Sequence, residues 1–557
     1  MDKKVQIYCR NTSSYIDIDG GTSLMQIADG LNLGLNYDPI CALVNNKPEH
    51  LGFNVYTPKQ VEFVDLTSSE GKTTYTRTLC MLLYRALNYI DPSLSIRYEH
   101  SISHGIFCRI FDKAGNIISI SDSLLVEQIK QNISDLIAKD LPLLRYEKLT
   151  ADVIEIFRRQ RLDDKVKLLE SVSTLYTSYY TLDGLADSFY GPLAPSTRYI
   201  QAFDLVAWHD GLLLLGADSL NPSLPAQPEK QAKMYDAFTQ YLKFNSIIGV
   251  SYVGELNNAI ANRRAADLIN VAEALHNKRL GRISDQIMEQ GASLIFIAGP
   301  SSSGKTTTAK RLAIQLMTNL MVPKLISLDD YFVNRKNTPL DENGDYDYES
   351  IYALDLDLFH SDMQKLLRGE EINLPTYSFE LGERVEKERP LRLNKNDVLI
   401  IEGIHGLNPI LSEGLPADRI FKMYVSALTT LHIDNHNWIS TSDNRLLRRI
   451  VRDNKYRHTS PQDTIRRWPS VRRGEERWIF PFQENADATF NSSLLFELGV
   501  MKRYALPLLE NVPHNIPEYA TAYRLRRLLN CFCDIPEAQV PSTSLLREFL
   551  GGSSFHY

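Results

Sequence analysis

The sequence predicts a multidomain protein whose C-terminal half is an α/β domain, with a parallel sheet and helices on both faces. An apolar strand at 294–298 runs directly into a glycine-containing loop and then into a helix with a buried apolar stripe. Two more apolar strands, at 324–328 and 397–401, each lead into carboxylates, as parallel strands do at the ligand-binding edge of a sheet. Ahead of this half, short alternating strands and two helical stretches predict a β-grasp unit and an α+β domain.

Length and composition bound the class of protein. A chain of 557 residues exceeds a single hydrophobic core, and 43% hydrophobic with 23% charged residues is typical of folded globular domains. The six cysteines form no CxxC pair, which indicates reduced thiols. No stretch has the apolar length of a signal peptide or a transmembrane helix, so we expect a cytoplasmic protein without membrane contact. The net charge of −7 disfavours general nucleic-acid binding.

Three units follow one another along the chain. Residues 1–66 alternate through short strands around one short helix and predict the β-grasp unit. Residues 67–275 contain two helices separated by alternating strands and predict the α+β domain. Residues 276–557 form the α/β domain. The nearest approach to a linker is the stretch 218–230, which is rich in Pro, Ser and Gln.

The first half of the chain resembles two known kinds of domain. Residues 1–66 resemble a TGS domain, and Glu70-Gly71 together with 140–148 resemble the editing domain of threonyl-tRNA synthetases. That family carries HxxxH at the start of the first helix and Cys-x3-His further on, whereas this chain reads TYTRTL from Thr74 and has neither ligand in 191–199. The resemblance therefore implies an editing-like domain without its metal ligands, and it leaves RNA contact through the N-terminal domains open.

Two histidine groups have spacings that could bind zinc on a helix. They are His100 and His104 with Cys108, and His432 with His436. The residues around the first group alternate as strand and turn, which scatters the side chains. The second pair lies in a polar segment without a third ligand nearby. We interpret both groups as ordinary histidines.

The loop after the strand at 294–298 has the pattern GxxxxGK[ST]. Glycines admit backbone N–H groups to phosphates, and the helix N-terminus adds a favourable dipole. Lys305 is expected to reach the outer phosphates as a catalytic group, and the Thr306 hydroxyl to bind magnesium. The pattern therefore predicts ATP and Mg²⁺ as the bound species. The nucleotide-binding residues expected from it are Gly299, Pro300, Ser301, Ser302, Ser303, Gly304, Lys305, Thr306 and Thr307.

Carboxylates at the two neighbouring strand ends complete the predicted chemistry. Phosphoryl transfer to an alcohol needs a base within hydrogen-bond reach of the hydroxyl, and Asp329 is the candidate. In the alternative interpretation Asp330 is the base and Asp329 only an N-cap. Glu402 is placed to hold magnesium or its waters. His405 could act as a catalytic acid, although a local polar contact is the simpler interpretation.

A basic segment, 445–477, carries eleven Lys or Arg against four Asp or Glu. Helical spacing puts Arg445, Arg448, Arg449 and Arg452 on one face and apolar residues on the other. Such a stripe predicts a lid that clamps phosphates, with Arg448 and Arg452 on the nucleotide. A solvated charged face and an RNA-binding surface are the alternatives.

In this order the motifs resemble the uridine kinase and phosphoribulokinase family over roughly residues 285–500. The segments that carry the resemblance, besides the loop, are Ser327-Leu328-Asp329, Tyr346-Asp347, 375–379, 397–403 and 446–453. The resemblance implies that Asp329 is the base, that Asp347, Tyr377 and Phe379 face the acceptor, and that Arg457 is a further substrate contact. Uridine kinases carry a His past the Phe, where this chain has Gly382 or its neighbours, and a Gly-Arg pair where it reads His458-Thr459.

We therefore expect transfer of the ATP γ-phosphoryl to the 5′-hydroxyl of a nucleoside, with uridine and cytidine as the expected acceptors. A sugar-phosphate kinase like phosphoribulokinase is one alternative, for which an aromatic pair would waste contact area. An RNA- or ribosome-associated regulatory ATPase is the other, because a TGS domain makes it plausible. Homo-oligomer formation is left open.

Overall fold

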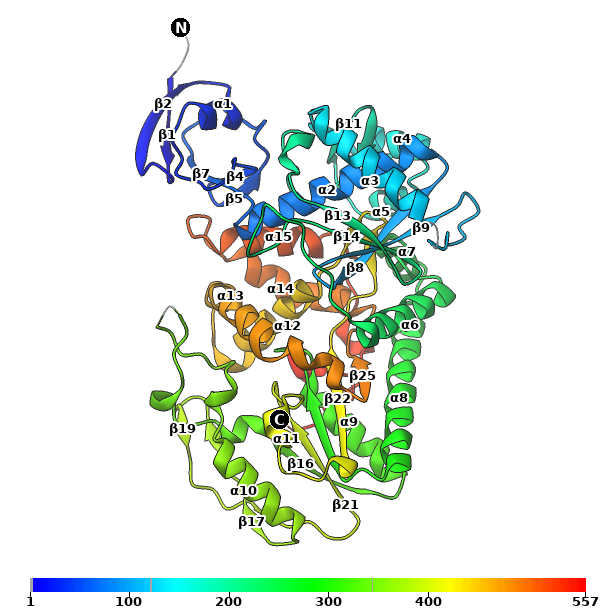
Figure 1. Ribbon diagram of the computed structural model, residues 1–557, viewed down its shortest axis with the longest axis vertical. Helices are drawn as coiled ribbons and strands as arrows, with labels where there is room; N and C mark the ends of the chain where they lie inside the picture. Colours follow the sequence, from blue (N-terminus) through cyan, green and yellow to red (C-terminus); the bar gives the residue numbers. More distant parts are fainter. Residues whose placement is uncertain (1–3, 121–122, 343, 557) are drawn as a thin grey trace.

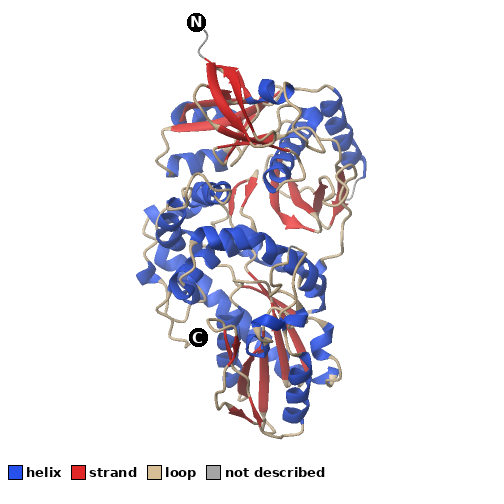
Figure 2. Cartoon of the chain, turned by 90° about the vertical axis from the view of Figure 1, so that its left-hand side faces the viewer, coloured by secondary structure: helices blue, strands red, loops and turns tan. Residues whose placement is uncertain are grey.

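A computed structural model describes residues 4–120, 123–342 and 344–556 of the chain. Its long axis runs from the N-terminal β-rich unit to the α/β sheet (Figure 1). Helices fill the middle, between the strands of the two ends (Figure 2), and the sequence colours identify many of them as C-terminal (Figure 1). No helix within the described ranges is long and apolar enough to cross a bilayer.

The N-terminal unit is a five-stranded sheet covered by one helix. Its strand order is β2-β1-β7-β4-β5, and β1 pairs with β7 in parallel. Ser23 caps α1 through a capping box with Gln26. This layout is compatible with the predicted β-grasp unit, and the TGS assignment stays a prediction. The elements are β1 (Lys4–Cys9), β2 (Ser14–Asp19), β3 (Thr22–Ser23), α1 (Leu24–Asp29), β4 (Cys41–Val44), β5 (Lys47–Glu49), β6 (Asn54–Val55) and β7 (Gln60–Val64).

The following α+β region has two sheets, with strand orders β13-β14-β9-β8 and β10-β11-β12. Its long first helix, α2, packs on α3 through an apolar stripe, because both helices contribute to one core. The elements are α2 (Ser69–Ile90), β8 (Ser95–Ile102), β9 (Gly105–Phe111), α3 (Ser123–Ala138), β10 (Leu144–Leu149), α4 (Thr150–Arg159), α5 (Asp163–Ser171), β11 (Tyr176–Leu182), β12 (Leu185–Asp187), η1 (Thr197–Tyr199), β13 (Asp204–Trp208), β14 (Gly211–Leu215), α6 (Ala232–Ile248), α7 (Val253–Ala261) and α8 (Ala265–Gln290). The expected domain boundary at 275/276 lies inside α8, which is continuous.

The predicted parallel sheet of the C-terminal half is confirmed. Its order is β16-β21-β15-β22-β25, and every neighbouring pair is parallel. The glycine loop leaves the central strand, and Ser327 pairs with Glu402 at the same edge. The strands are β15 (Leu294–Ala298), β16 (Val322–Ser327), β21 (Asp397–Glu402), β22 (Ile420–Ser426) and β25 (Ala488–Asn491), and the flanking elements are α9 (Lys305–Thr318), η2 (Leu328–Tyr331), η3 (Arg335–Asn337), η4 (Ile351–Ala353), α10 (Leu356–Leu367), α11 (Pro409–Ser412) and η5 (Ala417–Arg419).

A group of helices lies between this sheet and the front half of the chain (Figure 1). They are α12 (Thr441–Arg457), α13 (Pro461–Trp478), α14 (Glu497–Glu510) and α15 (Tyr519–Leu529). The remaining elements are β17 (Ile372–Asn373), β18 (Tyr377–Ser378), β19 (Glu383–Arg384), β20 (Pro390–Leu391), β23 (His432–Asp434), β24 (Asn437–Trp438), η6 (Phe480–Asn485), η7 (Glu537–Gln539) and α16 (Arg547–Leu550).

Buried charges join the two halves of the chain. The Lys165 ammonium lies 2.9 Å from the carboxylate of Asp187 and 2.9 Å from that of Asp434, and the three side chains are at most 1% exposed. Removing one partner of such a network leaves a buried charge uncompensated, at a cost of roughly 3–5 kcal/mol. The front half is therefore built to pack against β23 of the C-terminal half.

The histidine groups take part in packing. His432 lies 2.9 Å from a backbone carbonyl of β8, and His436 lies 2.7 Å from a carboxylate of β12. His100 stacks on an aromatic ring of α6 at 3.5 Å, Cys108 is buried, and His104 sits at the turn between β8 and β9. Within the described ranges no three His, Cys, Asp or Glu side chains are grouped as a metal site would need.

Candidate active site

The loop after β15 has the backbone geometry that close approach to phosphate requires. A Cβ on Gly299 would lie 2.0 Å from the Val425 carbonyl oxygen, and Gly304 has a φ of +83°. Both positions therefore need glycine. Because α9 begins at Lys305, the unpaired N–H groups of its first turn lie at the loop. Lys305 Nζ donates to the Pro300 carbonyl at 3.2 Å, which folds the side chain back over the loop.

Two buried arginines of α12 support the loop from the side of the core. Arg445 donates to the Ser301 carbonyl at 3.1 Å and pairs with both carboxylate oxygens of Glu475. Arg448 donates to the Ser302 carbonyl at 3.4 Å and forms an ion pair with a buried glutamate of α14. Each side chain is at most 1% exposed. Arg448 was predicted to contact the nucleotide. In the structure its guanidinium contacts the loop backbone and is paired with a carboxylate of the protein.

The outer part of the same stripe is more accessible. Arg449 Nη1 donates to the Ser301 hydroxyl at 2.9 Å. Arg452 pairs with Asp453 at 2.8 Å and is 17% exposed, while Arg457, at the end of α12, is 47% exposed. The arginines differ in exposure because of their positions on α12. Arg445 and Arg448 point into the core, and the later arginines of the helix lie nearer the surface. The predicted phosphate contact of Arg452 and substrate contact of Arg457 stay predictions.

Two of the predicted carboxylates share one buried region with Lys305. The Thr306 hydroxyl donates to Glu402 Oε1 at 3.1 Å, and the Ser327 hydroxyl donates to the same oxygen at 3.1 Å. Burial, followed by the charge of Asp329, raises the pKa of Glu402 to about 7. Burial also raises the pKa of Asp329, against the opposing charge of Lys305. The Thr306 hydroxyl and the Glu402 carboxylate are adjacent oxygen groups, a ligand type that suits a hard divalent cation such as magnesium.

The structure distinguishes Asp329 from its neighbour. Asp330 pairs with Arg389 at 2.8 Å and accepts from the Tyr377 backbone N–H at 3.5 Å. It is therefore engaged with the segment around β18. Ser327, whose hydroxyl accepts from the Asp329 N–H at 3.3 Å, provides the N-cap of η2. The side chain of Asp329 is not used for capping.

Glu349 is a third carboxylate of this region, and no sequence motif predicts a role for it. A Cβ on Gly474 would lie 2.2 Å from the Glu349 Cβ, and Glu349 Oε2 is buried without a hydrogen-bond partner in the described part of the chain. Burial, followed by the charge of a neighbouring glutamate, raises the pKa of Glu349 to about 7. Arg449 and Lys305 oppose that rise. The available signal was an acidic residue two positions after Asp347, in a segment already matched to the family.

The aromatic residues form a cluster on the acceptor side. The rings of Tyr377 and Phe379 lie 5.2 Å apart, and Phe332 lies 5.6 Å from the first and 5.9 Å from the second. Tyr377 is 8% exposed and Phe379 50% exposed. The Arg457 guanidinium is 5.8 Å from the Phe379 ring centre, and its charge also acts on Asp329. Of the predicted pair, Phe379 is therefore the more exposed ring.

Asp347 and Gly382 are the remaining positions that the family resemblance singles out near the acceptor. Asp347 accepts from the Glu349 backbone N–H at 3.1 Å and so belongs to its own turn. Gly382 has a φ of +74°, and a Cβ there would lie 2.5 Å from the guanidinium carbon of Arg335. Arg335 donates to the Phe379 carbonyl at 2.8 Å. Near the position where the family resemblance implies a histidine, this chain has a guanidinium.

His405 is buried beside the sheet edge. Burial lowers the pKa of His405 to about 3, with the charge of Lys305 acting in the same direction. Both effects favour the neutral ring over an imidazolium that could donate a proton. This favours a local packing role over the alternative of a catalytic acid.

A segment after α15 folds over the first turn of α9. Glu548 in α16 accepts from both the backbone N–H and the hydroxyl of Thr307. A Cβ on Gly304 would lie 2.7 Å from the Leu545 side chain. The glutamate thus contacts donors that the loop pattern assigns to nucleotide phosphates. This contact is not predictable from the sequence, because its two residues are 241 positions apart and no local pattern joins them.

Known proteins are similar to part of this chain. Residues 294–494 match the model of the "Phosphoribulokinase / Uridine kinase family". A uridine kinase of Staphylococcus aureus is 28% identical over 200 residues, which cover 36% of this chain and 86% of the relative. Among solved structures, a possible uridine kinase from Bacillus stearothermophilus is 20% identical over 38% of this chain and 98% of that chain, with a TM-score of 0.26. A D-glycerate 3-kinase from Cryptococcus neoformans is 15% identical over 50% of this chain and 90% of that chain, with a TM-score of 0.21.

Proposed function

Because residues 294–494 form a domain of the phosphoribulokinase and uridine kinase family, we propose that this chain transfers the ATP γ-phosphoryl group to the 5′-hydroxyl of a nucleoside. The observation that carries the proposal is that three groups lie in one site: the phosphate loop with its lysine, a candidate base and an exposed aromatic ring. Lys305 lies at the phosphate loop, Asp329 lies next to it, and Arg457 links Asp329 to the exposed ring of Phe379. A flat, half-exposed ring suits stacking by a nucleobase.

Asp329 is the base of the proposed reaction. It accepts the proton of the acceptor hydroxyl as the hydroxyl oxygen bonds to the γ-phosphorus and the bond to the departing ADP oxygen breaks. Its raised pKa makes it a better proton acceptor than an exposed carboxylate. Lys305 places a positive charge where the phosphates gather negative charge. Magnesium, held by Thr306 and Glu402, would neutralise charge on the outer phosphates.

One observation favours a second candidate acceptor. Arg335 and Arg457 both lie near Phe379, and a guanidinium binds phosphate through paired hydrogen bonds. A phosphorylated sugar could use these groups. A nucleoside acceptor would stack its base on the Phe379 ring, whereas a sugar phosphate would place its phosphate on the arginines. Phe379 is therefore needed for binding a nucleoside but not for binding a sugar phosphate.

An acceptor screen with the full chain tests the proposal. ATP, Mg²⁺ and one acceptor at a time would be incubated, the acceptors being uridine, cytidine, adenosine, ribulose 5-phosphate and D-glycerate, and the phosphorylated product identified by mass spectrometry. We expect uridine or cytidine 5′-monophosphate. Asp329→Asn should lower kcat roughly 10²- to 10⁴-fold, whereas the matched control Asp330→Asn should keep most of it.

Three results would contradict the proposal. Product from ribulose 5-phosphate alone would move the acceptor to sugar phosphates. ADP formation without any acceptor would indicate an ATPase. Full activity in Lys305→Ala would place the chemistry outside this loop, since the lysine contributes charge and no core packing.

A further inference from the structure

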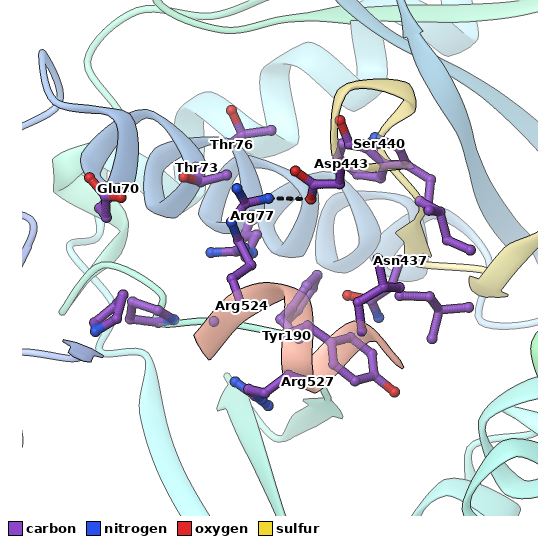
Figure 3. A pocket seen from close by; sticks show the side chains of 18 of the residues that line it. Glu70, Thr73, Thr76, Arg77, Tyr190, Asn437, Ser440, Asp443, Arg524 and Arg527 are labelled. Carbon is purple, nitrogen blue, oxygen red and sulfur yellow. Dashed lines mark hydrogen bonds and ion pairs between the residues drawn. The ribbon is translucent and has the colours of Figure 1, made fainter. Parts of the chain in front are cut away.

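A second cavity lies between the front half and the helices of the C-terminal half. Its volume is about 430 Å³, within the range of small-molecule sites. The start of α2, the loop after β12, the segment from β24 into α12, and α15 line it. Figure 3 shows Arg77 and Arg524 side by side next to Asp443, with Arg527 near Tyr190. None of these residues belongs to the phosphate loop or the acceptor cluster.

Charge in this cavity is only partly balanced. Its lining carries four cationic and two acidic side chains. Arg524 forms an ion pair with Asp443, and the charge of Glu70 also acts on it. The guanidinium groups of Arg77 and Arg527 have no hydrogen-bond or ion-pair partner within residues 4–120, 123–342 and 344–556. Arg527 lies over the rings of Tyr190 and Tyr523, but within these ranges no carboxylate of the protein pairs with either guanidinium.

The backbone makes room for one of these charges. A Cβ on Gly191 would lie 2.2 Å from Arg77 Nη1, so any other residue there would displace the guanidinium. Burial, followed by the charges of Arg524 and Arg527, lowers the pKa of Arg77 to about 10. The group is still protonated at neutral pH, and it is crowded by like charge. A partly buried cation without an anion is unfavourable unless a ligand supplies one.

We propose that this cavity binds a phosphate ester of nucleotide size, with its phosphate at Arg77 and Arg527. A guanidinium group can donate two parallel hydrogen bonds to one phosphate. Arg77 and Arg527 are able to do so, because neither is paired with a carboxylate in the described part of the chain. The organic part of the ligand lies against Tyr190 and Tyr523, whose ring centres are 5.5 Å and 6.0 Å from the Arg527 guanidinium. This proposal does not depend on which acceptor the kinase site phosphorylates.

The cavity is also one helix away from the phosphate loop. Asp443 lies in the first turn of α12, and Arg445 on the same helix donates to the Ser301 carbonyl. A ligand phosphate near Arg524 competes with Asp443 for that guanidinium. Occupancy would therefore act on the end of a helix that supports the nucleotide site.

Calorimetric titration of the full chain tests this site. A non-hydrolysable ATP analogue with Mg²⁺, at saturating concentration, first occupies the phosphate loop. Inorganic phosphate, ribose 5-phosphate, AMP and UMP are then titrated separately at physiological ionic strength. We expect one phosphate ester to bind once per chain. Arg77→Met and Gly191→Ala should each weaken that binding at least tenfold, and Arg198→Met, which removes an exposed arginine of the same domain, should not change it.

Thermal melting without ligand gives a second readout. Arg77→Met should melt at or above the wild-type temperature, because it removes an unbalanced charge, and phosphate esters should raise the melting temperature of the wild type only. A clear loss of stability in Arg77→Met would make the arginine structural and overturn the proposal. Absence of binding by every probe, or undiminished binding in Arg77→Met, would overturn it as well.

Discussion

Replacing Glu349 with Gln should stabilise the protein, and the gain should grow with pH. Burial raises the pKa of Glu349 from 4.5 to about 7. Between these values the folded chain keeps a proton that the unfolded chain releases, so this carboxyl lowers stability as pH rises through that window. Once the side chain is ionised, the cost is roughly 3 kcal/mol. The amide has a similar shape and no charge to desolvate. We therefore expect Glu349→Gln to gain about 1 kcal/mol at pH 5.5 and about 3 kcal/mol at pH 8.

Urea unfolding at several pH values, followed by tryptophan fluorescence, measures this gain. Trp468 and Trp478 lie on α13, which also carries the Gly474 that packs on Glu349, so they report on the right part of the fold. Glu371→Gln, at an exposed position, is the matched control and should show no pH-dependent gain. A gain that is constant or falls with pH would refute the reasoning, because it would mean that Glu349 is ionised and paired with Arg449 at neutral pH.

Two further predictions concern side chains that have the same predicted role but different environments in the structure. Phe379→Ala should raise the acceptor KM by about 5- to 150-fold in steady-state kinetics and leave the ATP KM unchanged, because it removes the exposed stacking ring. Equal effects on both KM values would contradict a role in acceptor binding. Arg448→Met should lower the free energy of unfolding by about 3–5 kcal/mol, since Glu497 would stay buried without its cation. Arg452→Ala, at a more exposed position, should leave stability nearly unchanged and raise the ATP KM; the reverse pattern would put Arg448 on the nucleotide.

The parallel sheet and its loop were predictable because their signals are local. A buried strand, a glycine loop and an apolar helix stripe follow one another between residues 294 and 320, and the structure confirms the strand and helix there. The relation of Asp329 to Glu402 was also predictable, since parallel strands end at one edge. Helical spacing likewise put Arg445 and Arg448 on one face, but it could not tell whether phosphates or protein carboxylates lie opposite that face.

The remaining contacts depend on residues far apart in the sequence. Glu548 reaches Thr307 across 241 positions, and Arg77 meets α15 only after the chain has folded around it. Glu349 was missed for a different reason, because its environment is created by Gly474 on another helix. Periodicity describes which face of an element is apolar, and it carries no information about which distant element covers that face.

The buried pair of Lys165 and Asp434 has a consequence for synthesis on the ribosome. The two residues are 269 positions apart, and at 5–20 residues per second the second follows the first after roughly fifteen seconds to a minute. During that time the nascent front half holds a lysine whose later partner has not yet been made. Its interface with β23 stays open to solvent, so the front half completes its packing only when most of the C-terminal half has emerged.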